Sequence, residues 1–263
     1  MKKGFLLVQL LASVLVYGQT IITQPAWAKY FDKPGLKGSF ILYDLKKDRF
    51  TVYNEAQMHE SFLPASTFKI CNSLIGLETG VIPDESFLIR WDGVKRGNEN
   101  WDRNNDLASA FRYSVVWYYQ ELARRVGAEK MQYWVALARY GNRKTGGSID
   151  QFWLQGDLRI TPAQQIDFLK RLYLNQLPFS MRNLDIVKKI MVVEQGDGYV
   201  LRAKTGWAVT NSVGWYVGWM EKGDDVYFFS TCIQGGDDFN MQDFGRYRID
   251  ITRSILNELA LLP

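Results

Sequence analysis

Histidine and cysteine are scarce in this chain of 263 residues, which has one histidine, His59, and two cysteines. A single histidine cannot supply a His-rich zinc site, so we expect no metal, and a Ser-His-Asp hydrolase would have to use His59. There is no G-x-S-x-G turn, and segment 141–147 lacks the lysine that completes a phosphate-binding loop. These absences exclude a His-rich zinc site, a G-x-S-x-G hydrolase and a phosphate-binding loop of this type.

The two cysteines, Cys71 and Cys232, fall in a predicted helix and a predicted strand. In an exported protein they could form a disulfide. Free cysteines in such elements commonly behave as small buried hydrophobic residues. We therefore expect two free, buried thiols.

Neither sign of charge dominates, because 32 lysines and arginines face 28 aspartates and glutamates, for a net charge of +4. With no basic run, the chain lacks the electrostatic footprint of a nucleic-acid-binding protein. A hydrophobic content of 47%, with 14% aromatic residues, is enough for a sizeable core and argues against disorder. The composition indicates a globular protein with no nucleic-acid partner.

Long apolar runs are absent except at the N-terminus, where Lys2 and Lys3 precede an apolar segment that ends near Gly18. This order is typical of a secretory signal peptide, which we assign to residues 1–18. The alternative is a membrane anchor, but the run is short for the ~20 residues that cross a bilayer. We expect export, cleavage and no stable membrane insertion afterwards.

Strands are predicted near both ends of the remaining chain, and helices between them. The five predicted strands are 37–44, 49–54, 199–205, 213–221 and 226–233, the first two forming a hairpin. The predicted helices are 66–80, one ending near Val126, 131–140, one starting at Thr161, and a C-terminal helix with Ile251, Ile255, Leu259 and Leu262 in step.

This order predicts an α/β (α+β) fold, built as an antiparallel β-sheet from both termini and flanked by the terminal helices. A mostly helical lobe is inserted at roughly residues 65–185. Residues 19–263 then form a single domain, because no linker, repeat or low-complexity segment divides them.

The sequence Ser66-Thr67-Phe68-Lys69 opens the first long helix. Positions three apart share a helix face, so the Ser66 hydroxyl and the Lys69 amine can meet. An alcohol needs a base to become a good nucleophile, and the helix N-terminus favours developing negative charge. Because most S-x-x-K sequences are accidental, this pair is a hypothesis that needs support from elsewhere in the chain.

A second candidate is Lys204-Thr205-Gly206, which ends a predicted strand. The lysine offers a fixed positive charge, the threonine a hydroxyl, and the glycine allows close approach of a ligand to the backbone. The same three residues recur at 144–146 between turn residues, where no sheet edge is expected. We therefore favour the copy at 204–206.

Three further segments complete a pattern: Ser114-Val115-Val116, Tyr140-Gly141-Asn142 and Gln151-Phe152-Trp153-Leu154. In order and spacing, these and the two candidates above resemble the class D (OXA-type) serine β-lactamases, from about Trp27 to the final helix. Ser114-Val115-Val116 stands where class A enzymes and penicillin-binding proteins have S-D-N. The resemblance implies the fold of the penicillin-recognising serine enzymes.

The resemblance also implies roles for the first motif. Ser66 attacks the lactam carbonyl and becomes the acyl-enzyme, while Lys69 reacts with CO₂ to give a carbamate that acts as general base for acylation and deacylation. No other cofactor is implied. A pocket walled by Phe68, Val116, Trp153 and Leu154 is expected to desolvate the Lys69 amine and lower its pKa by ~3 units, which costs about 4 kcal/mol.

The Trp153 N–H is expected to hydrogen-bond the carbamate; the alternative is that Trp153 packs the core. Ser114 is expected to relay a proton to the lactam nitrogen, although from sequence alone it is better explained as the N-cap of the helix that follows. The backbone N–H groups of Ser66 and Trp207 are expected to form the oxyanion hole.

Lys204, Thr205, Gly206 and an arginine are expected to hold the substrate carboxylate. In the family this arginine precedes the last helix. Arg248 fits that position best, and Arg246 is the alternative.

The leading hypothesis is an exported hydrolase that destroys β-lactam antibiotics, penicillins at least, in the periplasm of a Gram-negative bacterium and so confers resistance. Its partner is the small-molecule β-lactam, and it is a monomer or a homodimer. Residues 101–103 and those after Gly206 are expected to set the substrate spectrum. The alternatives are a β-lactam sensor domain, which acylates without turnover, and a D-Ala-D-Ala peptidase or penicillin-binding protein.

Overall fold

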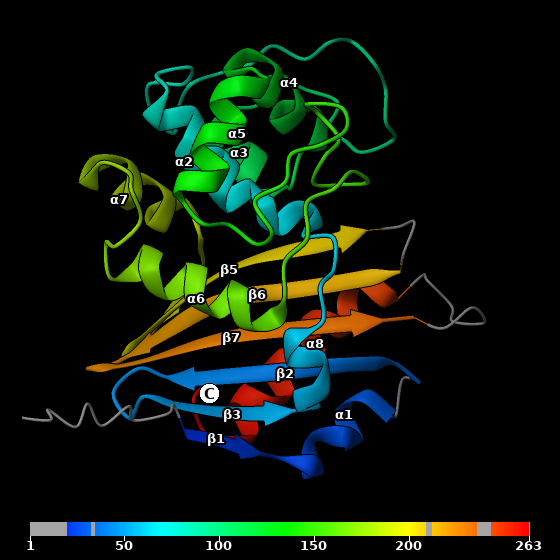
Figure 1. The fold of residues 1–263 in the computed structure, drawn as a ribbon, viewed down its shortest axis with the longest axis vertical. Helices are drawn as coiled ribbons and strands as arrows, with labels where there is room; N and C mark the ends of the chain where they lie inside the picture. Colours follow the sequence, from blue (N-terminus) through cyan, green and yellow to red (C-terminus); the bar gives the residue numbers. More distant parts are fainter. Residues whose placement is uncertain (1–19, 33–34, 209–211, 236–242, 263) are drawn as a thin grey trace, which may run out of the picture.

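The computed structural model describes residues 20–32, 35–208, 212–235 and 243–262, so the predicted signal peptide lies outside it. One seven-stranded sheet, with strand order β1-β3-β2-β7-β6-β5-β4, forms its centre (Figure 1). The strands are β1 (Thr20–Thr23), β2 (Lys37–Asp44), β3 (Arg49–Tyr53), β4 (Val192–Gly196), β5 (Tyr199–Ala208), β6 (Val213–Lys222) and β7 (Asp225–Gln234).

The sheet joins the two ends of the chain, as predicted. β2 pairs antiparallel with β3 in the predicted hairpin and with β7 on its other side, where Phe40 lies opposite Thr231. β5, β6 and β7 continue as an antiparallel meander. One edge differs from the prediction, because β1 runs parallel to β3. A short helix and β2 separate these two strands in the chain, so both can run in the same direction.

The helices are α1 (Ala28–Asp32), α2 (Lys69–Glu78), α3 (Leu107–Arg112), α4 (Val116–Val126), α5 (Ala128–Leu137), α6 (Pro162–Tyr173), α7 (Met181–Ile190) and α8 (Phe244–Glu258). Three 3₁₀ turns complete the structure: η1 (Pro25–Trp27), η2 (Glu55–His59) and η3 (Ala65–Phe68).

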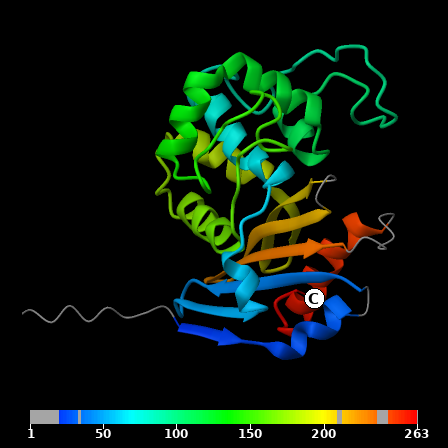
Figure 2. The same cartoon turned by 45° about the vertical axis from the view of Figure 1, so that its right-hand side comes forward.

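Helices cover both faces of the sheet. The terminal helices α1 and α8 share one face, where Phe31 and Ile255 meet Phe229 of β7 in a buried cluster. The Nε1 of Trp27 also donates a hydrogen bond to Glu258 Oε1 at 3.0 Å, which ties the two ends of the chain together. On the other face α6 packs on β6 and β7, while α2, α3, α4 and α5 form a separate lobe above β5 (Figures 1 and 2).

The helix predicted from Thr161 is confirmed, and Thr161 and Gln164 form a capping box. The helix expected at 131–140 is shifted: Gly127, with φ of +82°, precedes it, and Arg139 takes a positive φ just after its end. The C-terminal helix ends at Glu258, so the last apolar residues expected on it lie beyond its end. Bounds move in this way because positive-φ residues, not periodicity alone, end a helix.

Besides the short helix α1 and the two edge strands β1 and β4, two longer helices have no counterpart among the predicted elements. α3 begins at a capping box between Asp106 and Ser109. On α7, the side chains of Leu184 and Val187 are buried. Both signals are present in the sequence, as a cap in the first case and an i, i+3 apolar spacing in the second.

The lobe meets the sheet where η3 packs on β5. A Cβ added to Gly206 would lie 2.9 Å from the carbonyl oxygen of Pro64 and 3.0 Å from the Thr67 side chain. The sequence-based explanation, that Gly206 admits a ligand, is therefore incomplete: it also admits the turn that carries Ser66. Cys71 and Cys232 are free and buried, as expected.

We predict that Gly206→Ala lowers the free energy of unfolding by about 1–3 kcal/mol, because the new methyl group overlaps backbone atoms of the turn at 64–67. Thermal unfolding measures the change. Gly245→Ala is the matched control, because its Cβ would meet only ordinary contacts at 3.6 Å or more and it lies on helix α8. That change should be neutral or stabilising. Equal stability of Gly206→Ala and the parent protein would show that the contact is loose.

Candidate active site

A cleft of about 470 Å³ lies between the lobe and the sheet. Most of the predicted site residues line it, although they come from segments far apart in the chain. The lining residues are Ser66, Trp101, Ser114, Val116, Gln151, Leu154, Gln155, Thr205, Gly206, Trp207, Ala208 and Arg248. His59 is not among them, so the nucleophile has to find another base.

Ser66 and Lys69 meet as predicted. Lys69 Nζ lies 2.6 Å from Ser66 Oγ. The pair forms because η3 runs directly into α2, which places the two side chains one turn apart. Lys69 is fully buried, and burial lowers the pKa of its amine to about 7. A substantial fraction of the amine is therefore neutral at physiological pH and able to accept the Ser66 proton.

Phe68 and Trp153, both predicted as walls of the pocket, do not line the cleft. The Phe68 ring is fully buried and packs on Trp153, with the ring centroids 5.6 Å apart. Phe68 lies one position before Lys69 on the turn, so its side chain points to a different face from the one that Ser66 and Lys69 share. Val116 and Leu154 do line the cleft, as expected.

Trp153 lies against the same turn. Its carbonyl oxygen accepts a hydrogen bond from Ala65 N at 3.0 Å, and its ring packs against Phe68 in a tilted arrangement. Its indole Nε1 is buried without a hydrogen-bond partner among the described residues. Packing explains the ring but leaves the N–H unexplained, because a buried donor normally finds an acceptor.

Ser114 is not the N-cap of the helix that follows. Val115 takes that position, without a side-chain cap. The Ser114 Oγ instead accepts a hydrogen bond from Lys204 Nζ at 3.1 Å, which connects the lobe to β5. Ser114 holds a left-handed backbone with φ of +55°, a conformation that costs a serine roughly 1–2 kcal/mol. Such strain is commonly retained where it positions a functional side chain.

Lys204 is buried on β5, and its Nζ also donates to the carbonyl oxygen and hydroxyl of Thr205. Burial, then the charges of Lys69 and Arg248, hold the pKa of Lys204 well below its usual value. No acidic side chain pairs with Lys204 among the described residues. The cationic seam thus formed, defined here as Lys69, Lys204 and Arg248, suits an anionic ligand.

The two candidate arginines, Arg246 and Arg248, differ in their exposure and in their contacts. Both lie within α8, not before it as expected, because this helix already begins at Phe244. Arg246 is exposed and forms an ion pair with Asp250, 2.9 Å long. Arg248 lines the cleft, and its buried Nε and Nη1 have no hydrogen-bond partner in the part of the chain that the structure describes. Burial lowers the pKa of Arg248 to about 10, so its guanidinium still carries a charge at neutral pH.

Ser66 and Trp207 line the same cleft, on η3 and on β5. The close contact of Gly206 with the turn at 64–67 brings these two backbone segments together. The backbone groups expected to form an oxyanion hole therefore lie on adjacent segments.

Trp101 was expected only as part of a loop that sets specificity, yet it forms a wall of the cleft. Its Nε1 donates to the carbonyl oxygen of Tyr113, and its own carbonyl accepts from Trp117 Nε1. The sequence analysis did not single out Gln155, which also lines the cleft and carries no local signal, because it reaches the cleft through tertiary contacts alone. Ala208 lines the cleft too, and it lies in the segment after Gly206 that was expected to set the substrate spectrum.

Tyr140-Gly141-Asn142 has a structural role in this chain. Gly141 has a φ of +50°, and a Cβ there would overlap the carbonyl oxygen of Arg159. Asn142 donates to the carbonyl of Asp157 and accepts from Arg159 N, which closes the loop that carries Trp153. The second Lys-Thr-Gly copy, at 144–146, lies in this loop and not on a strand.

Within the described ranges, no cluster of three or more histidine, cysteine, aspartate or glutamate side chains could hold a metal ion. No helix in this part of the chain is long and apolar enough to cross a bilayer.

The family model of the penicillin-binding protein transpeptidase domain matches residues 36–259. A probable β-lactamase YbxI from Bacillus subtilis is 43% identical over 86% of this chain and 82% of its own length. The β-lactamase OXA-5 from Pseudomonas aeruginosa is 39% identical over 92% and 89%. The solved class D β-lactamase YbXI from Nostoc has a TM-score of 0.85 at 46% identity, covering 90% of this chain and 99% of its own. Together with the cleft around Ser66 and Lys69, these likenesses show that the chain belongs to the class D β-lactamases, which are serine β-lactam hydrolases.

Proposed function

We propose that this enzyme hydrolyses penicillins through a Ser66 acyl-enzyme, with Lys69 carbamylated by CO₂ as the general base in both halves of the reaction. The main observation behind this proposal is that the buried Lys69 amine, with a pKa of about 7, lies 2.6 Å from the Ser66 hydroxyl. An amine must be neutral to attack CO₂, and burial supplies this neutral form.

The residues present fit a carbamate on Lys69. The buried Trp153 Nε1 needs an acceptor, and its loop packs on the turn that carries Ser66. Burial of Lys69 as a cation is unfavourable without a partner, whereas an anionic group there would meet the positive charge of Lys204. When present, the carbamate supplies a base beside the Ser66 hydroxyl.

The other residues divide the work of lactam opening. The oxygen of Ser66 bonds to the carbonyl carbon, and the C–N bond of the lactam breaks. The proton of Ser66 passes to the base at Lys69 as the new C–O bond forms. Ser114 delivers a proton to the departing nitrogen and regains one from Lys204, to which it is hydrogen-bonded, and the proton taken from Ser66 restores Lys204. One water then cleaves the Ser66 ester and frees the carboxylic acid. Backbone N–H groups of Ser66 and Trp207 stabilise the carbonyl oxygen, an effect typically worth ~3 kcal/mol per donor.

Lys204, Thr205 and Arg248 hold the carboxylate of the substrate beside the reacting bond. Two buried nitrogens of Arg248, Nε and Nη1, have no partner among the described residues, so its guanidinium has N–H donors left for a carboxylate. We further propose that the enzyme is exported and acts in the periplasm of a Gram-negative bacterium, as a monomer or a homodimer, and confers resistance there.

Turnover of nitrocefin, a chromogenic cephalosporin, tests the catalytic proposal. In buffer with bicarbonate we expect many cycles per enzyme molecule. In CO₂-depleted buffer at pH 5.5 we expect at least a tenfold loss, since only roughly 3% of an amine with a pKa of about 7 is neutral there. Added bicarbonate should restore the rate. A single stoichiometric burst would indicate a sensor domain or a peptidase, and full activity without CO₂ would show that the free amine suffices.

The indole N–H of Trp153 can be removed while its ring is largely kept. We predict that Trp153→Phe slows deacylation at least tenfold more than acylation, so that the acyl-enzyme accumulates, because the carbamate loses its donor. Mass spectrometry and single-turnover kinetics measure both steps. Trp153→Ala, which also removes the packing on Phe68, should add a loss of stability. Equal slowing of both steps in Trp153→Phe would reduce Trp153 to a packing residue.

Arg248 and Arg246 form a matched pair on one helix. Arg248→Ala should raise the KM for benzylpenicillin about tenfold or more, because it removes a buried partner of the substrate carboxylate. Arg246→Ala should leave KM and kcat almost unchanged, since the side chain is exposed and its ion pair is a surface pair. Steady-state kinetics decides; a larger effect at Arg246 would reverse the assignment.

A further inference from the structure

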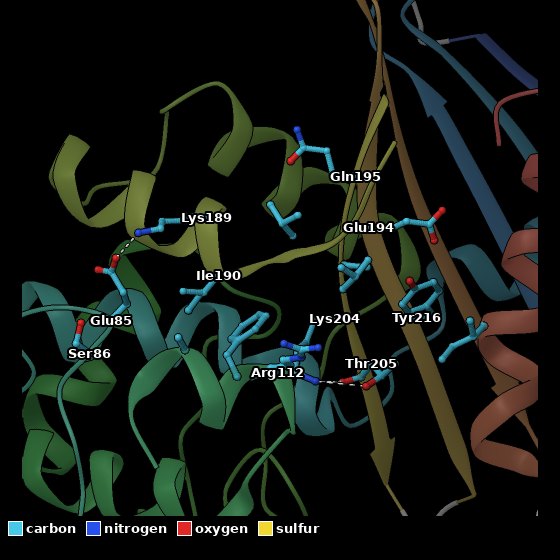
Figure 3. A pocket seen from close by; sticks show the side chains of 16 residues that line it. Glu85, Ser86, Arg112, Lys189, Ile190, Glu194, Gln195, Lys204, Thr205 and Tyr216 are labelled. Carbon is cyan, nitrogen blue, oxygen red and sulfur yellow. Dashed lines mark hydrogen bonds and ion pairs between the residues drawn. The ribbon is translucent and has the colours of Figure 1, made fainter. Parts of the chain in front are cut away.

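A second hollow adjoins the catalytic cleft and is larger, at about 810 Å³. It lies between α3 and α7 on one side and β4 and β5 on the other (Figure 3). Ser66 does not line it, but Thr205 lines both hollows, and Lys204 forms part of its wall. The size falls in the range of small-molecule binding pockets.

The charges around this second hollow do not balance. Its two acidic residues are both occupied, Glu85 by Lys189 at 2.6 Å and Glu194 by Arg253 at 2.6 Å. Figure 3 shows the Glu85–Lys189 pair on the helical side of the hollow. Arg112 and Lys204 also line it, and neither forms an ion pair with any described residue. Arg112 is therefore left for a ligand, and Lys204, whose three N–H groups already bond Ser114 and Thr205, adds positive charge beside it.

The rest of the wall is largely apolar. Phe111 and Ile190 lie on the helical side, and Val192 and Val193 on the edge strand β4. Val193 is 53% exposed and Val192 37% exposed, so apolar surface is open to solvent at this edge of the sheet. Apolar surface beside unpaired cations suits a molecule with one anionic group and an apolar body.

We propose that this second hollow binds a small apolar monocarboxylate, with the carboxylate between Arg112 and Lys204 and the apolar body against Phe111, Val192 and Val193. Lys204 then connects the two sites, because its ammonium also bonds Ser114 and Thr205 at the catalytic cleft. An anion in the second hollow shares the charge that anchors the substrate, so it should raise the KM of a β-lactam.

Octanoate is the probe, titrated calorimetrically into the enzyme with Ser66 free and with Ser66 acylated by a slowly hydrolysed β-lactam. We expect binding in both states, a higher KM for nitrocefin when octanoate is bound, and much weaker binding of uncharged 1-octanol. Binding that acylation abolishes would place octanoate in the catalytic cleft and overturn the proposal. Equal binding of 1-octanol would overturn its electrostatic part.

Variants of exposed residues separate the charge from the apolar surface. Arg112→Gln and Val193→Asp should each weaken octanoate binding at least tenfold, with nitrocefin turnover retained. Arg103→Gln is the matched control: Arg103 and Arg112 both lie over the Tyr113 ring, at 5.4 and 5.6 Å, but only Arg112 lines the hollow. No binding, binding that either change leaves intact, or an equal loss in Arg103→Gln would overturn the proposal. Calorimetry needs no hydrolysis, so failure here is distinct from failure of the catalytic mechanism.

Discussion

Burial of positive charge without a matching acid is the constraint on which this site depends. Lys69 and Lys204 are almost entirely removed from water, and Arg248 is largely so, yet none forms an ion pair with a described residue. Such burial opposes folding, because a charged group loses its hydration without compensation. Loss of the proton from part of the Lys69 amine lowers this cost, since burial brings the pKa of Lys69 close to physiological pH. The same unfavourable burial makes the cleft attractive to anions.

The cost is offset by the packing of the joint between lobe and sheet. The indole Nε1 of Trp215 on β6 donates to the carbonyl of Leu63, and Gln165 on α6 donates to the Thr67 hydroxyl, both within 2.9 Å. These two hydrogen bonds fix the turn at 64–67 to β6 and α6, and the missing side chain of Gly206 allows β5 to pack against the same turn. The nucleophile therefore sits on a short 3₁₀ turn fixed by the sheet, and not on a free helix end.

What the sequence predicts well is local. The Ser66–Lys69 pair, the cap at Thr161 and the hairpin at 37–54 depend on spacing within a few residues, and the structure confirms each. The functions of Ser114 and Gly206 depend on contacts with distant segments. Local rules therefore predicted Ser114 as the N-cap of α4, a position that Val115 occupies in the structure. The prediction that Phe68 lines the pocket was wrong because residues adjacent in a motif point in different directions, and only one face of the turn borders the cleft. Long-range contacts leave little trace in a single sequence.

Charge balance links the proposed carbamate to substrate binding. The positive charge of Lys69 is the second cause of the lowered pKa of Lys204, after burial. Conversion of that cation to an anion would remove a repulsion and add an attraction, and so favour the charged form of Lys204. A substrate carboxylate between Lys204 and Arg248 would then meet two fully charged partners, and the seam as a whole would approach neutrality. The carbamate proposed to activate Ser66 and the groups proposed to anchor the substrate would thus stabilise one another, because they share one poorly hydrated space.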